Sequence, residues 1–113
     1  MAISIDRGDV YWVNFEPSLG GEIRKTRPAI VLSNNAANAY LNRVQVIPIT
    51  SNTDRLYPGE AYVRLNTEKR KAMADQLTTV SKQRLGTKIG FLSSDDLGRV
   101  EVAVLLQLGI DRS

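Results

Sequence analysis

Short segments rich in β-branched and aromatic residues recur along the chain, separated by turn residues, and this pattern restricts the fold more than any other feature. Segments of this kind are typical of strands. We predict strands at residues 8–15, 29–33, 44–49, 61–65, 72–80 and 87–92. No long helix separates them, which argues against parallel βαβ units. The sequence therefore predicts a mainly β protein with a small, mostly antiparallel, barrel-like sheet.

Two helical segments accompany these strands. Asn34 precedes an alanine-rich stretch and can cap a short helix within residues 34–42. A second capping signal with acidic residues in the first turn lies at residues 93–96 and predicts a C-terminal helix. Residues 100–110 are apolar almost all round. A domain this small can hardly enclose such a helix, so we expect part of it to contact another subunit.

Four local predictions concern single positions or short segments. Trp12 lies inside the first predicted strand and is expected in the core. Pro48 cannot donate to a sheet ladder and is expected at an edge, an end or a bulge. Residues 66–71 are expected to form a polar turn that carries Lys69, Arg70 and Lys71. Residues 81–86 are expected to form one helical turn closed by a glycine.

The chain has 113 residues and contains neither cysteine nor histidine. This length predicts a single domain, residues 1–113. The missing residue types exclude disulfides, thiolate metal sites and histidine-ligated zinc. We expect no metal and no cofactor. Any acid–base chemistry must use carboxylates, tyrosine, lysine or arginine.

The charge distribution is uneven. The net charge of +3 divides into 13 − 8 = +5 for residues 1–91 and 2 − 4 = −2 for residues 92–113. A basic body hints at a polyanionic partner, although ordinary surface variation would look the same. The sequence has no long apolar run and no signal-peptide pattern, so we expect no membrane association and a cytoplasmic location.

The segment Arg24–Ser33 begins as a basic loop and becomes apolar at Pro28. Proline holds the preceding residue extended, so Arg27 is expected at the mouth of a strand. An arginine anchored there, beside Arg24 and Lys25, suits a phosphate-binding or phosphate-cleaving site. A solvated charge cluster is the alternative. Glu22, close by in the sequence, is either a general base or a counter-ion.

Four blocks of the sequence together resemble the MazF/PemK toxins. They occur in the family's order and spacing at residues 7–13, 26–32, 47–51 and 75–85. The resemblance implies an SH3-like small barrel, of the CcdB/PemK kind, with a C-terminal helix. It also implies a homodimer in the bacterial cytoplasm that cleaves single-stranded RNA at specific sequences, without a metal. Such toxins are held inactive by a cognate antitoxin of the MazE/PemI kind.

The resemblance also assigns roles to individual residues. The family's catalytic arginine falls on Arg27 and its catalytic threonine on Thr50. Further RNA-contacting positions fall on Glu22, Ser51, Asp75 and Gln76.

The chemistry of RNA is consistent with these roles. RNA carries its own nucleophile, the 2′-hydroxyl, so the protein must orient the backbone, stabilise the phosphorane and move two protons. Arg27 can bind the phosphate and Thr50 can hold an oxygen, with Glu22 as a helper in proton transfer. Arg24 and Lys25 would attract the RNA backbone. Asp75 and Gln76 either read base edges or satisfy loop backbone.

Two rival functions remain open. A non-enzymatic, CcdB-like poison of the same fold would bind a protein such as DNA gyrase, because fold does not determine function. A plain RNA-binding module would bind without cutting.

Overall fold

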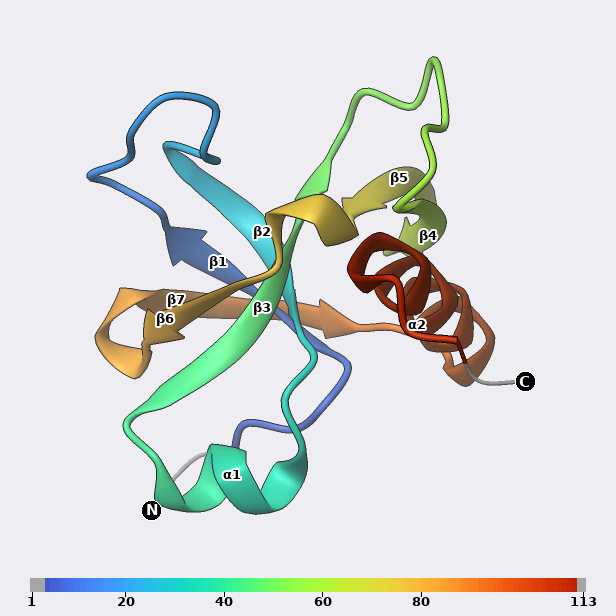
Figure 1. Ribbon diagram of the computed structural model, residues 1–113. Helices are drawn as coiled ribbons and strands as arrows, with labels where there is room; N and C mark the ends of the chain where they lie inside the picture. Colours follow the sequence, from blue (N-terminus) through green and yellow to red (C-terminus); the bar gives the residue numbers. More distant parts are fainter. Residues whose placement is uncertain (1–3, 112–113) are drawn as a thin grey trace.

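Seven antiparallel strands form one strongly curled sheet in the computed structural model, which describes residues 4–111 (Figure 1). The strands are β1 (Asp9–Asn14), β2 (Thr26–Val31), β3 (Arg43–Thr50), β4 (Glu60–Leu65), β5 (Glu68–Met73), β6 (Thr78–Ser81) and β7 (Leu85–Phe91). The helices are α1 (Asn35–Tyr40) and α2 (Ser94–Leu108), with 3₁₀ turns η1 (Ala74–Gln76) and η2 (Lys82–Arg84). The strand order is β4-β5-β3-β2-β1-β7, and β6 also pairs with β3. The predicted class, mainly β with a C-terminal helix, is confirmed as a curled half-barrel.

Strand β3 lies at the centre of this sheet. One edge pairs with β2, and the other pairs with β6 along Arg43–Val46 and with β5 at Ile49 and Thr50. The expectation of an edge, an end or a bulge for Pro48 is wrong, because this residue is buried in a central strand. It is tolerated there because it lies between the residues paired with β6 and those paired with β5, where no ladder bond needs its missing N–H.

The predicted strand at residues 72–80 is broken in two. Strands β5 and β6 pair with the same edge of β3, but η1 separates them. More residues lie between Ala72 and Thr78 than between their partners Ile49 and Val46. The 3₁₀ turn absorbs this surplus and lifts Asp75 and Gln76 out of the ladder.

The predicted polar turn at residues 66–71 is also wrong. Only Asn66 and Thr67 form the turn, with positive φ angles of 51° and 70°. Leu65 pairs with Glu68, so β4 and β5 form a two-residue hairpin. Positive φ at both central residues is the geometry of a type I′ turn, normally marked by glycine. Threonine at the second position hides that signal, and Lys71 consequently lies on a strand.

Near the end of the sheet, two further expectations fail in part. The helical turn predicted at residues 81–86 is present as η2, but it ends at Leu85, and Gly86 belongs to β7. Trp12 is 43% exposed instead of buried. It lies on the same face of β1 as Val10, but α2, which covers that face elsewhere, packs over β4 and η1.

Two apolar clusters fill the two sides of the curled sheet. One contains Val10, Ile30, Ile47 and Ile49 and is covered by Val100 and Ala103 of α2. The other contains Tyr11, Val13, Val44 and Val46 among its members. Alternate residues of β1, β2 and β3 supply the two clusters, which is why these strands carry apolar residues on both faces.

Both predicted helix caps are present. The side chain of Asn34 accepts a hydrogen bond from the N–H of Ala37, and that of Ser93 accepts one from the N–H of Asp96. Gly109 ends α2 in the left-handed conformation. Within residues 4–111 no helix is long and apolar enough to cross a membrane.

A charged pair ties β1 to β7 beside a buried phenol. Lys88 Nζ lies 3.2 Å from Asp9 Oδ1, and this hydrogen bond raises the pKa of Lys88. The Tyr11 hydroxyl is buried and has no hydrogen-bond partner among the described residues. Burial, followed by the negative charge of Asp9, raises the pKa of Tyr11. Both groups therefore hold their protons more tightly in the folded protein.

We predict that Tyr11→Phe keeps or raises stability at neutral pH, by up to about 1 kcal/mol, because it removes an unpaired buried hydroxyl. Above about pH 10 the unfolded phenol ionises while the folded one resists, so the wild type loses stability as pH rises. Lys88 contributes to the same alkaline loss in both proteins. Between neutral and alkaline pH, the free energy of unfolding should therefore fall less in the variant than in the wild type. Urea unfolding at the two pH values measures this. A large loss of stability in Tyr11→Phe at neutral pH would contradict the conclusion that the hydroxyl is unpaired.

Candidate active site

Arg27 and Thr50 lie on neighbouring central strands and on the same face of the sheet. Arg27 shares a face of β2 with Ala29 and Val31, whereas Thr50 shares a face of β3 with Val46. Ala29 pairs with Pro48 and is the last residue of β2 paired with β3, so Arg27 and Thr50 each lie two residues beyond this last pair. Pro28, between Arg27 and Ala29, has no N–H to extend the ladder. The two residues therefore stand where the strands stop pairing.

Each of these side chains is held by one local hydrogen bond. Arg27 is half-buried, and its Nε donates to the carbonyl of Arg24 at 3.1 Å. Within residues 4–111 its terminal guanidinium nitrogens have no hydrogen-bond partner. Thr50 Oγ1 accepts from the N–H of Asn52 at 3.2 Å and keeps its own proton to donate. An arginine with open terminal nitrogens and a threonine hydroxyl on the same face of the sheet suit a phosphate group.

The loop at residues 15–25, between β1 and β2, is fastened to the sheet by side chains. Gln76 Oε1 accepts from the N–H of Ile23 at 3.0 Å, and its Nε2 donates to the carbonyl of Gly21 at 3.2 Å. Arg84 donates to the carbonyls of Asn14 and Glu16 where the loop begins. Sequence reasoning missed Arg84, although it lies in the last of the four blocks.

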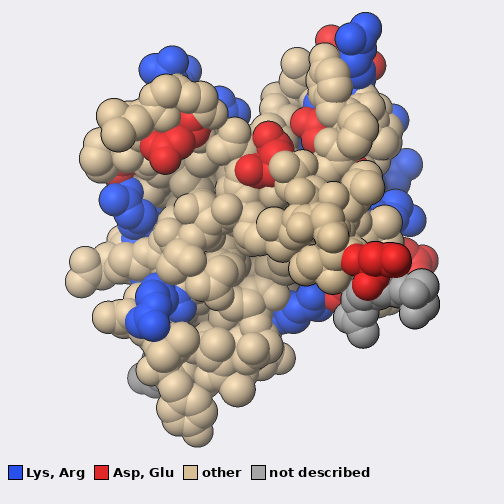
Figure 2. All heavy atoms as spheres, viewed as in Figure 1, with Lys and Arg blue, Asp and Glu red and all other residues tan. Residues whose placement is uncertain are grey.

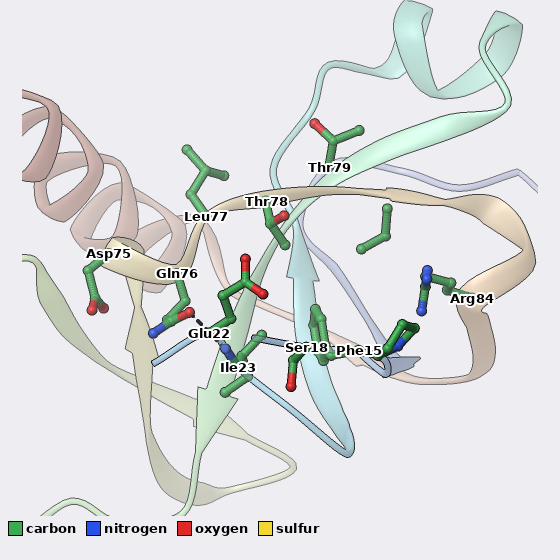
Figure 3. A pocket seen from close by; sticks show the side chains of 12 residues that line it. Phe15, Ser18, Glu22, Ile23, Asp75, Gln76, Leu77, Thr78, Thr79 and Arg84 are labelled. Carbon is green, nitrogen blue, oxygen red and sulfur yellow. Dashed lines mark hydrogen bonds between the residues drawn. The ribbon is translucent and has the colours of Figure 1, made fainter. Parts of the chain in front are cut away.

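Glu22, Asp75 and Gln76 line one cavity of about 360 Å³ between this loop and β6 (Figure 3). The Glu22 carboxylate accepts from the N–H of Leu19 at 2.7 Å, within its own loop. Among the described residues Glu22 forms no ion pair, so the structure does not support its interpretation as a counter-ion. Asp75 is exposed at the cavity's edge. Three of the sequence-predicted residues are thus brought together.

The other predicted residues lie at the margins. Lys25 takes a positive φ of 70°, and its N–H donates to the Glu16 carboxylate at 2.6 Å. Arg24 and Lys25 are both exposed, as is Ser51, which follows β3 directly. Figure 2 shows two raised lobes at this end of the molecule, over loops 15–25 and 51–59, with a hollow between them. Both lobes carry basic and acidic side chains, so the visible face is not uniformly basic.

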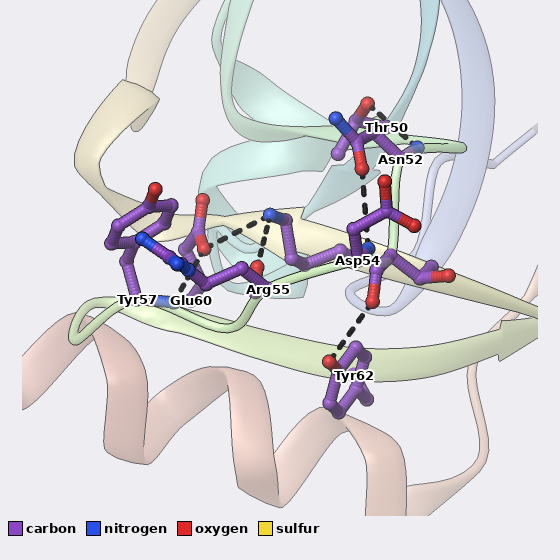
Figure 4. A network of polar contacts seen from close by, with 9 residues as sticks. Thr50, Asn52, Asp54, Arg55, Tyr57, Glu60 and Tyr62 are labelled. Carbon is purple, nitrogen blue, oxygen red and sulfur yellow. Dashed lines mark hydrogen bonds and ion pairs between the residues drawn. The ribbon is translucent and has the colours of Figure 1, made fainter.

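No group of three or more aspartate or glutamate side chains within residues 4–111 is placed to hold a metal ion. The loop at residues 51–59 contains a polar network that sequence reasoning also missed. It joins Thr50 to Glu60, Tyr62 and Lys71 across β3, β4 and β5 (Figure 4).

The sequence pattern of a known family, described as "PemK-like, MazF-like toxin of type II toxin-antitoxin system", matches residues 6–108. The chain belongs to this family. A curated relative, Endoribonuclease MazF9 of Mycobacterium tuberculosis (strain ATCC 25618 / H37Rv), is 33% identical over 113 residues. The match covers 92% of this chain and 96% of the relative. The resemblance drawn from the four blocks is thereby confirmed.

Solved structures of this family share the fold. MazF of Deinococcus radiodurans superposes with a TM-score of 0.85 at 28% identity, covering 96% of this chain and 100% of that one. An endoribonuclease in complex with its cognate antitoxin, from a mycobacterial species, has a TM-score of 0.82 at 22% identity. That match covers 97% of this chain and 100% of the other, and at this identity it shows the fold alone.

We predict that Gln76→Ala loosens the loop at residues 15–25, because both of its hydrogen bonds to that loop are lost. Amide exchange at Ile23 should quicken by roughly 5–30-fold, as expected for the loss of about 1–2 kcal/mol. Hydrogen exchange followed by NMR measures this. Asp75→Ala is the matched control, since the exposed neighbour makes no hydrogen bond to the loop among the described residues. Unchanged exchange at Ile23 in Gln76→Ala would show that other contacts hold the loop.

Proposed function

We propose that this chain is the toxin of a type II toxin–antitoxin system and acts as a sequence-specific, metal-independent endoribonuclease on single-stranded RNA. The position of Arg27 and Thr50 on one face of the sheet, each two residues beyond the last β2–β3 pair, carries this proposal. An arginine with open terminal nitrogens and a hydroxyl with a proton to donate are the kinds of group that a phosphate-cleaving site requires. Membership of the PemK/MazF family and a relative named as an endoribonuclease support it. A poison that only binds protein has no need of this pair.

The reaction needs no nucleophile from the protein. The 2′-oxygen of the RNA bonds to the adjacent phosphorus and loses its proton, while the bond to the 5′-oxygen breaks and that oxygen gains a proton. The products are a 2′,3′-cyclic phosphate and a 5′-hydroxyl. Arg27 offsets the negative charge on the phosphorane, and Thr50 orients a non-bridging oxygen or the 2′-hydroxyl. The in-line geometry supplies much of the rate.

Proton transfer is the demanding part of this mechanism. With no histidine in the chain, a carboxylate is the natural base, and arginine is a poor one because its guanidinium keeps its proton at neutral pH. Glu22 lies on the loop next to Arg27 in the sequence and lines the cavity with Asp75. We assign Glu22 the helper role in moving the proton. Its loop must be held in place for this, which is the contribution of Gln76.

Binding of single-stranded RNA assigns roles to the remaining residues. Asp75 is exposed on a 3₁₀ turn and free to accept from a base edge, since specific reading of RNA uses splayed bases in pockets. Ser51 extends the hydroxyl row that begins at Thr50. Arg24 and Lys25 lie on the exposed loop and attract the RNA backbone. Binding should therefore weaken as salt rises.

Homodimer formation and neutralisation by an antitoxin of the MazE/PemI kind complete the proposal. Val102, Leu106 and Leu108 of α2 are 65%, 61% and 56% exposed. A mostly apolar groove of about 650 Å³ lies between α2 and the segment 56–62. An apolar stripe beside such a groove suits a second copy of the chain, as expected from the helix's apolar character. Solved structures include complexes named MazE–MazF from Deinococcus radiodurans at 25% identity.

We predict that Arg27→Ala abolishes most RNA cleavage, by about 10²–10³-fold in kcat, because the phosphorane loses its charged donor. The test is cleavage of a long, weakly structured RNA in EDTA, with analysis of the new ends. Arg43→Ala is the matched control, since Arg43 is an exposed arginine at the opposite end of β3. Discrete cuts with cyclic-phosphate and 5′-hydroxyl ends are expected from the wild type and the control.

An Arg27→Ala variant that cuts as well as the wild type would contradict the assigned site. A folded wild type that cuts no RNA would contradict the enzymatic function and favour the protein-binding poison. A variant that binds RNA with near-wild-type affinity but does not cut it distinguishes catalysis from simple binding.

We predict that the cognate antitoxin suppresses cleavage and raises the melting temperature. A partner that binds only the folded state stabilises it by about 2.7 kcal/mol at a concentration one hundred times its Kd. An acidic, disordered segment fits the basic margin formed by Arg24 and Lys25. Thermal unfolding and the EDTA cleavage assay, each with saturating antitoxin, measure the two effects. Full cleavage under saturating antitoxin would contradict neutralisation at this site.

A further inference from the structure

The loop at residues 51–59 leaves β3 directly after Thr50 and is tied back at several points (Figure 4). Thr50 Oγ1 accepts from the N–H of Asn52, and Asn52 Oδ1 accepts from the N–H of Asp54 at 3.1 Å. The Tyr62 hydroxyl donates to the carbonyl of Thr53 at 3.1 Å. The first half of the loop thus follows a defined path beside the proposed catalytic threonine.

The middle of the loop is held by a buried lysine. Lys71 of β5 is only 6% exposed, and its Nζ donates to the carbonyl of Arg55 at 2.7 Å. The same Nζ lies 3.1 Å from Glu60 Oε1, and that oxygen also accepts from the N–H of Tyr57 at 2.8 Å. One ammonium group therefore fastens the loop at Arg55 and, through Glu60, at Tyr57.

Burying the Lys71–Glu60 ion pair costs desolvation free energy, but such a pair can specify one conformation of the loop. Lysine is almost never buried without a partner, and a buried ion pair is often no more stabilising than apolar residues of the same size. Lys71 is also directly paired with Thr50 across the β3–β5 ladder. Lys71, whose ammonium group fastens the loop, thus lies directly across the ladder from the proposed catalytic threonine.

We propose that Lys71 is a positioning residue that holds Ser51–Arg55 in the conformation that receives single-stranded RNA beside Thr50. This inference rests on the proposed ribonuclease function. A loop fixed in advance does not need to be ordered when RNA binds, so the loss of loop entropy does not weaken RNA binding. Lys71 touches no reacting atom in this scheme and acts only through the loop.

The decisive variant is the double substitution Lys71→Met with Glu60→Gln. Methionine removes the donor to Arg55, while glutamine keeps an oxygen for the N–H of Tyr57. The net charge is unchanged, so the long-range attraction for RNA is preserved. The matched control is Glu68→Gln with Arg70→Met, which removes an exposed ion pair (2.6 Å) from the same strand. Glu60→Gln alone keeps the bond from Lys71 to Arg55.

The first measurement is limited digestion with trypsin, which cuts after Arg55 when the loop opens. Cutting after Lys25, in the other loop, is the internal reference. We expect faster cutting after Arg55 in the double variant and wild-type rates in the control and in Glu60→Gln. This readout does not depend on RNA cleavage.

The second measurement is the steady-state kinetics of RNA cleavage. We expect KM to rise roughly 5–30-fold in the double variant, as for the ordering of about one residue. Because the reacting groups are intact, kcat should stay within about twofold. Discrimination between cleaved and uncleaved sequences should fall in parallel. The control and Glu60→Gln should keep the wild-type KM.

A folded double variant with unchanged cutting after Arg55 and unchanged KM would overturn the proposal. Faster cutting after Arg55 with unchanged KM would overturn the role in RNA binding, because an open loop would then bind RNA equally well. If Glu60→Gln alone opens the loop as much as the double variant, the ion pair and not Lys71 holds it, and this also overturns the proposal. If the double variant does not fold, opening of the loop in Glu60→Gln relative to the wild type still overturns the proposal. A wild type that cuts no RNA contradicts the proposed function instead.

Discussion

The arrangement of the molecule depends on β3 being hydrogen-bonded along both edges. Strand β2 occupies one edge, and β6 and β5 share the other in succession. A single long strand can serve two partners only if the sheet curls and the partner chain turns between them, which is the role of η1. Thr50 ends β3 where this pairing stops. The same curl separates the apolar residues of β1–β3 into two clusters.

Both long loops leave the sheet close to this end of β3, and both are fastened by side chains from β5, η1 and the segment before β7. Gln76 and Arg84 hold the loop at residues 15–25, and Lys71 holds the loop at residues 51–59. In each case the acceptor or donor on the loop is backbone, so the bond specifies the path of the loop without specifying its side chains. Loop sequences can then vary around a constant frame, which suits the sequence-specific cleavage of RNA proposed for this site.

Local signals predicted the elements whose causes are local. The caps at Asn34 and Ser93, the strand at Ala61–Leu65 and the C-terminal helix depend on neighbouring residues and were recognisable from them. The hairpin at Asn66–Thr67 was not recognisable, because threonine rarely takes positive φ and only the pairing of β4 with β5 imposes it here. The exposure of Trp12 and the central position of Pro48 depend on which elements pack beside them, and no local pattern carries that information.

The sequence by itself determined the chemistry available to the site and the family. Without histidine or cysteine, only carboxylates, hydroxyls, lysine and arginine remain for acid–base chemistry, and four short blocks of the sequence pointed to the PemK/MazF toxins. Only the tertiary structure decided that Arg27 and Thr50 lie on one face just beyond the last β2–β3 pair, and that Gln76 and Lys71 bind loop backbone. The reason is physical: these contacts join residues far apart in the chain, and strand register, which brings them together, is set by the packing of the whole sheet.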